Sequence, residues 1–132
     1  MFRDVHDSEI VAYSVDARVR EVVLVVGPGT GSCAQEFKLV FRGVIAHQFA
    51  YPELPSIVFS LEKVPAADIV RKEWADFTEG SRQCGWPGSW AVSLEAALVY
   101  CNVENINGYE LTASYGMSGW LLAKSVEQIN AP

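Results

Sequence analysis

The sequence predicts an α+β domain with a mainly antiparallel sheet of about six strands and one or two helices. Four strand-like segments come first, then one or two helical segments, then two more strands. Such blocks of strands and helices favour α+β over a parallel, alternating α/β fold. The 132 residues match the size of one domain and contain no linker or repeat, so we expect a single domain over residues 1–132.

Four segments in the first half are predicted strands, because apolar and polar residues alternate or β-branched residues dominate. They are residues 10–15, 21–26, 37–42 and 56–63. The valine-rich second segment is expected to be buried on both faces. Gly43 could bend the third, which could continue in extended form through residues 44–51.

The glycine-rich residues 27–32 could suggest a phosphate-binding loop. Such a loop requires Lys-Ser or Lys-Thr after its last glycine, and then a helix. Here Ser32 is followed by Cys33, and the next segment is strand-like. We therefore expect a hairpin connection and no cofactor.

The apolar period becomes helical after Pro65, a residue that suits a first helical turn. Gly80 is expected to end this helix, and residues 81–90 are expected to be irregular. Residues 92–101 fit either a strand or a helix, and the propensity of Leu-Glu-Ala-Ala-Leu favours a helix.

The last part of the chain reads as a hairpin. Residues 105–108 mark a turn, and two strands are predicted over residues 109–115 and 120–126. Between them, the glycines of residues 116–119 permit the backbone angles of a tight turn.

The composition indicates an acidic, soluble, cytoplasmic protein. Sixteen acidic and ten basic residues give a net charge of −6, which disfavours nucleic-acid binding. The longest aliphatic run, residues 22–26, is too short to span a membrane, and the N-terminus carries no export signal. Cys33, Cys84 and Cys101 are odd in number and widely spaced, which argues against a disulfide framework.

No catalytic, cofactor or metal site is predicted, and the sequence leans away from an enzyme without settling the question. The N-terminal group of Asp4, His6, Asp7 and Glu9 has suitable ligand atoms, but frayed ends often carry such charges. No nucleophile motif is present, and the apolar surroundings of His47 favour a packed histidine over a catalytic one.

Five residues are candidates for binding a partner. Trp86 and Trp90 lie in a segment expected to be irregular, and tryptophan is enriched at binding hot spots. Glu95, Glu104 and Glu110 lie where acidic residues outnumber basic ones, so they could attract a basic protein. Core packing of the tryptophans and simple solubility are the alternatives.

Residues 109–124 read Tyr-Glu-Leu-Thr-Ala-Ser-Tyr-Gly-Met-Ser-Gly-Trp-Leu-Leu-Ala-Lys, and residues 6–10 read His-Asp-Ser-Glu-Ile. These stretches resemble the closing hairpin and the opening of small uncharacterised bacterial proteins. Some small acidic proteins of this general look serve as immunity proteins beside secreted toxins. The resemblance implies a bacterial origin and an inhibitory role, and it transfers no catalytic residue.

Three functions remain open. The first is a protein-binding module, such as an immunity-type inhibitor of a basic partner. The second is a small-molecule binder or an enzyme of unfamiliar type, with a pocket where the sheet meets the segment of Trp86 and Trp90, and with His47 or an acid as its polar group. The third is a structural or assembly subunit of unknown oligomeric state.

Overall fold

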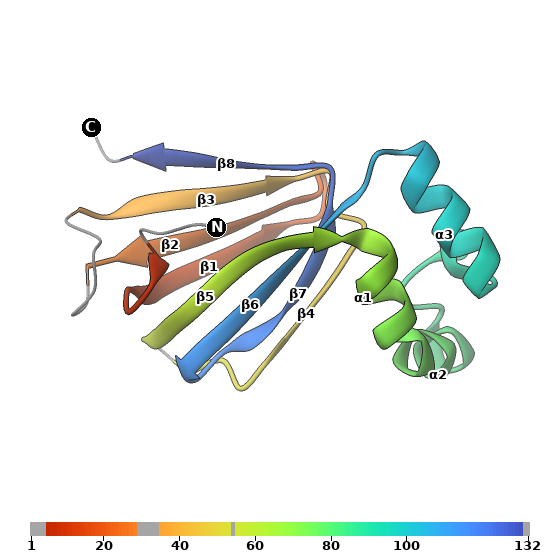
Figure 1. Ribbon diagram of the computed structural model, residues 1–132, viewed down its shortest axis with the longest axis horizontal. Helices are drawn as coiled ribbons and strands as arrows, with labels where there is room; N and C mark the ends of the chain where they lie inside the picture. The colour runs from red at the N-terminus through yellow and green to blue at the C-terminus, as the bar shows by residue number, and fades with distance from the viewer. Residues whose placement is uncertain (1–4, 29–34, 54, 131–132) are drawn as a thin grey trace.

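The computed structural model describes residues 5–28, 35–53 and 55–130. Over these residues the protein is α+β, with eight strands, three α-helices and a short 3-10 helix (Figure 1). In chain order the elements are β1 (Glu9–Asp16), β2 (Glu21–Gly27), β3 (Phe37–Arg42), β4 (Ala46–Ala50), β5 (Ser56–Pro65), α1 (Ala66–Lys72), α2 (Trp74–Cys84), η2 (Ser89–Ala91), α3 (Leu94–Val103), β6 (Asn107–Tyr115), β7 (Ser118–Ala123) and β8 (Ser125–Asn130).

All eight strands form one antiparallel sheet in the order β4-β7-β6-β5-β1-β2-β3-β8. The antiparallel arrangement is confirmed, but the expected number of about six strands is wrong, because bends divide two of the predicted strands. Gly43, with φ of 64°, separates β3 from β4. Lys124 separates β7 from β8. The glycine-rich residues 29–34, between the paired strands β2 and β3, lie outside the described residues.

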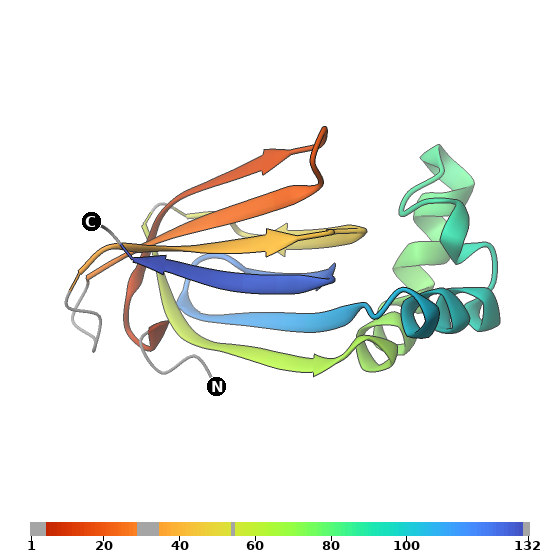
Figure 2. The ribbon, with the colours of Figure 1, turned by 90° about the horizontal axis from the view of Figure 1, so that it is seen from above.

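The two bends lie against each other and bring the ends of the sheet together. The backbone N–H of Lys124 donates to the carbonyl oxygen of Arg42 (2.9 Å), and a side chain at Gly43 would collide with Lys124. β3 pairs with β8 on one side of the bends, and β4 pairs with β7 on the other. The strands therefore curve round into what we call the rolled sheet, β1 to β8 (Figure 2).

The inside of the rolled sheet holds one of two hydrophobic cores, the sheet core. Phe41 of β3 and Tyr109 of β6 meet there with ring centroids 5.2 Å apart, although β3 and β6 are not neighbouring strands. Alternation along β2 supplies Val22, Leu24 and Val26 to this core. The other face of β2 is only half-buried, so the expectation that this strand is buried on both faces is wrong.

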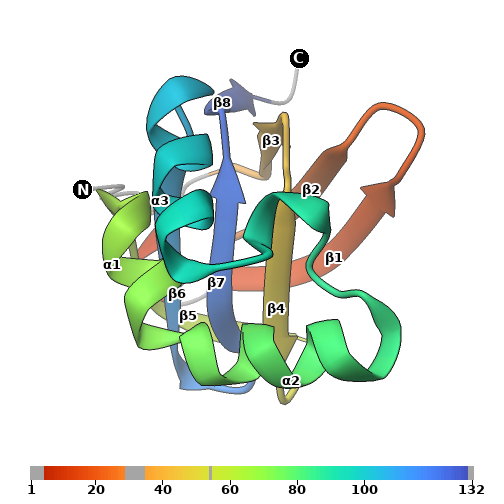
Figure 3. The ribbon, with the colours of Figure 1, turned by 90° about the vertical axis from the view of Figure 1, so that its right-hand side faces the viewer.

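The second core, the helix core, lies between the helices and the outer side of the rolled sheet. Figure 3 shows the helices in front of β7 and β4. Side chains along β7 point alternately to the two faces of the sheet. Trp120 and Leu122 pack in the helix core, and Leu121 and Ala123 pack in the sheet core. β7 is thus shared by both cores, and all four of these residues are buried.

The helix expected after Pro65 is present but is divided and longer than predicted. α1 ends and α2 begins at Glu73, whose φ and ψ of −97° and 9° interrupt the helix. Gly80 does not end α2, so that prediction is wrong; a Cβ there would lie 2.6 Å from the ring of Trp86, and the glycine lets this indole pack closely. Gly85 ends α2 instead, with φ of 80°.

The remaining segments follow the sequence more closely. The helical alternative for residues 92–101 is confirmed by α3. Residues 81–84 belong to α2 and residues 89–91 to η2, so the segment expected to be irregular is partly helical. No described helix is long and apolar enough to cross a membrane.

Candidate functional site

An aromatic cluster fixes the segment between α2 and α3. Phe77 of α2 is buried at its centre, and its ring lies 5.2 Å from that of Trp86, 5.9 Å from that of Trp90 and 5.5 Å from that of Trp120. Trp74 completes the cluster at 6.0 Å. The segment that carries η2 is therefore attached to the helix core by its tryptophans, in edge-on and tilted ring contacts that aromatic pairs prefer.

The start of α3 is set by a side-chain cap. Ser93 has extended backbone angles, and its hydroxyl oxygen accepts a hydrogen bond from the backbone N–H of Ala96 (3.1 Å). Serine is among the preferred residues at this position because it satisfies an otherwise unpaired helix N–H group. Glu95 lies in the first turn, where a negative charge complements the helix dipole.

Both sides of α3 are apolar. Leu94, Ala97, Leu98 and Cys101 face the helix core. Val99 and Val103 lie on the side that faces solvent, with exposed fractions of 56% and 65%. A surface helix usually places polar residues on its solvent side, so this outer face of α3 is atypical.

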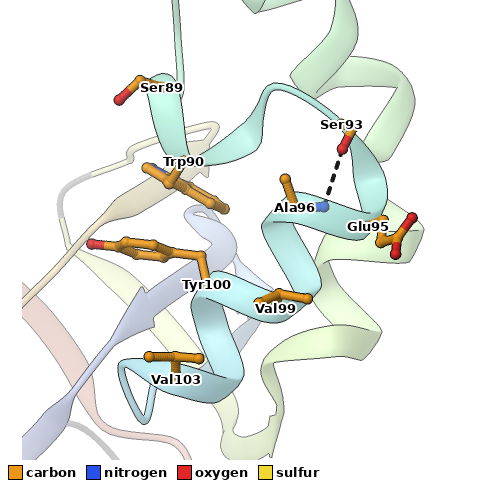
Figure 4. A pocket seen from close by; sticks show the side chains of 8 residues that line it. All are labelled: Ser89, Trp90, Ser93, Glu95, Ala96, Val99, Tyr100 and Val103. Atoms are coloured by element: carbon orange, nitrogen blue, oxygen red, sulfur yellow. Dashed lines mark hydrogen bonds between the residues drawn. The ribbon is translucent and has the colours of Figure 1, made fainter.

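The outer face of α3 and the adjoining η2 form a shallow, open groove with a volume of about 590 Å³. We call it the α3 groove; it is lined by Ser89, Trp90, Ser93, Glu95, Ala96, Val99, Tyr100 and Val103. The rings of Trp90 and Tyr100 stack at one side, with centroids 5.8 Å apart and planes 26° from parallel. Figure 4 shows this pair beside the capped helix start, with Val99 and Val103 following along α3.

The structure brings together two of the five partner-binding candidates. Trp90 and Glu95 both line the α3 groove. Glu104 follows α3 and pairs with Lys124 (3.5 Å), whereas Glu110 lies in β6 and pairs with Lys72 of α1. Among the described residues Glu95 has no ion-pair partner, so its carboxylate is the one of these three that is free to meet an external cation.

Trp86 belongs to a different surface from Trp90. It packs against Phe77 and Trp120 and lines a separate cavity that also contains His47. Burial lowers the pKa of His47, so the imidazole is neutral at neutral pH. The ring of His47 lies 5.7 Å from that of Phe49, consistent with a packed histidine.

Three apolar or aromatic residues that line the α3 groove were not predicted from the sequence: Val99, Tyr100 and Val103. A signal was present: Val92, Ala96, Val99 and Val103 recur at intervals of four, three and four residues, which places them on one side of a helix. This spacing did not identify an exposed apolar face, because the opposite side of the helix is equally apolar.

The chemistry of metals and thiols is limited in the described part of the chain. It contains no group of three or more His, Cys, Asp or Glu side chains that could hold a metal ion; Asp4 lies outside the described residues. Burial raises the pKa of the Cys101 thiol to about 11, whereas Cys84 is exposed. The arrangement around α3 thus offers apolar contact and one carboxylate, which suits binding.

Comparisons of the chain with protein families, with curated proteins and with solved structures found no match. The resemblance of residues 109–124 to the closing hairpin of small bacterial proteins therefore stays a prediction.

Proposed function

We propose that the protein is a protein-binding module that holds a basic partner in the α3 groove. The observation that carries the proposal is the uncovered apolar outer face of α3. An immunity-type inhibitor is the form of this function that the acidic charge and the resemblance of residues 109–124 favour.

The apolar outer face supports binding because its residues are contiguous. Single exposed apolar side chains are common on protein surfaces and need no explanation. Here Val99 and Val103 adjoin the stacked pair of Trp90 and Tyr100 in one groove. Contiguous apolar surface of this kind marks interaction sites, and Trp and Tyr dominate binding hot spots.

The charges indicate what the partner presents. Glu95 is the only charged residue among those that line the α3 groove. A lysine or arginine of the partner that flanks an apolar segment would meet this carboxylate while the segment covers Val99 and Val103. The net charge of −6 would speed the approach of a basic protein.

The test is capture from a lysate of the native organism with matched baits. Wild-type protein is compared with Val99→Asp, which places a charge in the α3 groove, and with Val19→Asp. Val19 is a suitable control because its exposed fraction, 56%, equals that of Val99 and it lies outside the groove. We expect a stoichiometric basic protein with wild type and Val19→Asp, and at least roughly tenfold less with Val99→Asp.

The contribution of Glu95 is then measured with the captured protein. Glu95→Gln should weaken binding and lower its salt dependence, whereas Glu104→Gln should change binding less because Glu104 already pairs with Lys124. Three outcomes would contradict the proposal: capture that Val99→Asp leaves unchanged, capture of a second copy of this chain alone, and capture of nothing by accessible bait. The second would favour the assembly-subunit alternative.

A further inference from the structure

A second cavity, separate from the α3 groove, lies where the rolled sheet meets the segment after α2. Its volume is about 240 Å³. We call it the hairpin cavity, because the end of the β1–β2 hairpin forms one wall; it is lined by Val15, Asp16, Ala17, Arg20, Glu21, Val22, Val44, Ile45, Ala46, His47, Trp86 and Pro87. Most of these residues are apolar, as is typical of cavities that bind small molecules.

The walls of the hairpin cavity are held in place by packing and hydrogen bonds. Val22 is buried in the sheet core, and Trp86 is packed against Phe77. The backbone N–H of Val44 donates to the carbonyl oxygen of Arg20 (3.0 Å), which ties the end of the hairpin to the opposite wall. These contacts fix part of its walls, whereas Val15, Ala17 and Arg20 are exposed at the end of the hairpin.

The charges around the hairpin cavity leave one cation without a partner. The carboxylate of Asp16 accepts hydrogen bonds from Arg18 Nε (3.1 Å) and Nη2 (2.9 Å). The carboxylate of Glu21 lies 3.5 Å from Arg42 Nε, and Arg42 also pairs with Glu127 of β8. Both acids thus have a neighbouring guanidinium, whereas no described carboxylate forms an ion pair with Arg20. A ligand with a negative charge would supply the ion-pair partner that Arg20 lacks.

We propose that the hairpin cavity binds a small aromatic carboxylate. The apolar walls, including the indole of Trp86, would contact the ring, and the guanidinium of Arg20 would hold the carboxylate. Guanidinium groups bind carboxylates through paired hydrogen bonds. His47 adds a ring nitrogen that can act as a second polar contact. The volume lies below the usual range for drug-sized ligands, so a single ring is the expected size.

Benzoate is the probe, followed by NMR of the backbone amides of the full chain. Benzamide has nearly the same shape without the charge, and benzylamine carries the opposite charge. We expect benzoate to shift amides of residues 15–22, 44–47 and 86, and to bind at least about tenfold more tightly than benzamide. Benzylamine should bind more weakly than benzoate, because its ammonium group would replace the carboxylate beside the guanidinium of Arg20.

Substitutions test the role of Arg20. Arg20→Gln should weaken benzoate binding to the level of benzamide and leave benzamide binding unchanged, and Arg20→Lys should give an intermediate affinity. Arg71→Gln is the matched control, since Arg71 is exposed on α1 and outside the cavity. Val99→Asp should leave benzoate binding unchanged, which separates this proposal from that of the α3 groove.

Equal affinities for benzoate and benzamide would overturn the proposal, as would amide shifts centred outside the hairpin cavity. Absence of any shift at millimolar benzoate would also overturn it. The amide spectrum also reports whether each variant is folded, so a loss of binding caused by unfolding would be recognised. If Arg20→Gln does not fold, Arg20→Lys provides the comparison with wild type.

Discussion

Phe77 joins α2, the segment of Trp86 and Trp90, and β7 through its ring contacts. Phe77→Ala should lower the free energy of unfolding by about 3–5 kcal/mol, because it removes a buried ring and leaves a cavity. Tyr115→Ala, at an exposed position, should change it by less than about 1 kcal/mol. Urea denaturation of both variants measures these differences, and equal effects would show that the cluster does not hold the helices.

His47 should make stability depend on pH. Burial disfavours the charged imidazole, so the pKa of His47 in the folded protein lies below the ordinary value of 6.5. The unfolded chain therefore binds more protons near and below that pH, and the free energy of unfolding falls as the pH drops below about 6.5. This contribution is fully present above that pH.

The comparison of wild type with His47→Gln isolates this effect, since Asp16 and Glu21 of the same cavity are unchanged in both proteins. Denaturation between about pH 5 and 8 should show a smaller pH dependence for His47→Gln. Identical pH profiles would mean that His47 is not desolvated in the folded protein.

The two described cysteines should differ in reactivity. Burial raises the pKa of the Cys101 thiol to about 11, so little of the reactive thiolate exists at pH 8. Iodoacetamide should modify Cys84 in the folded protein and Cys101 only after denaturation. Mass spectrometry of the digested protein measures both, and equal rates for the folded protein would contradict the burial of α3 against the helix core.

At the scale of elements, Gly119 allows β4 to pair with β7. A Cβ at Gly119 would lie 1.9 Å from the carbonyl oxygen of Gln48, so Gly119→Ala should force β4 away from β7. We expect faster hydrogen exchange in β4 and a loss of about 1–3 kcal/mol in stability. Gly27→Ala is the control, because its added methyl would meet only the side chain of Val11 (3.1 Å). Wild-type exchange in β4 would contradict the predicted clash.

The existence of most elements could be predicted because alternation and helical spacing are local properties of the sequence. Their ends could not. A glycine such as Gly80 can either end a helix or make room for a neighbouring side chain. Only the structure shows that Gly80 makes room for the ring of Trp86. The division of the predicted strands at Gly43 and Lys124 depends on the two bends meeting, which no single segment reveals.

The candidate site was predictable in part for a similar reason. Trp90 and Glu95 could be selected by residue type, but the sequence could not show that Trp86, four residues from Trp90, lines a different cavity. It also could not show which apolar side of α3 the rest of the protein covers. Which side of a helix is buried depends on the assembled fold. Val99 and Val103 therefore became candidates only when the structure showed that they are exposed.

At the scale of the whole molecule, β7 should couple the two cores. Leu121 lies in the sheet core and Leu122 in the helix core, and both are fully buried. Leu121→Ala and Leu122→Ala should each lower the free energy of unfolding by about 2–5 kcal/mol. Each variant should still unfold in a single transition, as expected for the single domain that we propose over residues 1–132.

Fluorescence of the tryptophans reports on the helix core, and circular dichroism in the far ultraviolet reports on the strands and helices together. The two signals should change at the same urea concentration in both variants. Separate transitions would show that the helices and the rolled sheet unfold independently.

The pairing of β3 with β8 has a consequence for synthesis of the chain. Arg42 and Glu127, which form an ion pair across these strands, are 85 residues apart in sequence. At ordinary rates of translation, the ribosome needs on the order of ten seconds to make this interval. During that time β3 has no partner on one edge, and such edges promote aggregation. Lys38 and Arg42 place positive charges in this otherwise apolar strand. Like charges disfavour pairing between two such strands, so we expect them to limit aggregation until β8 is made.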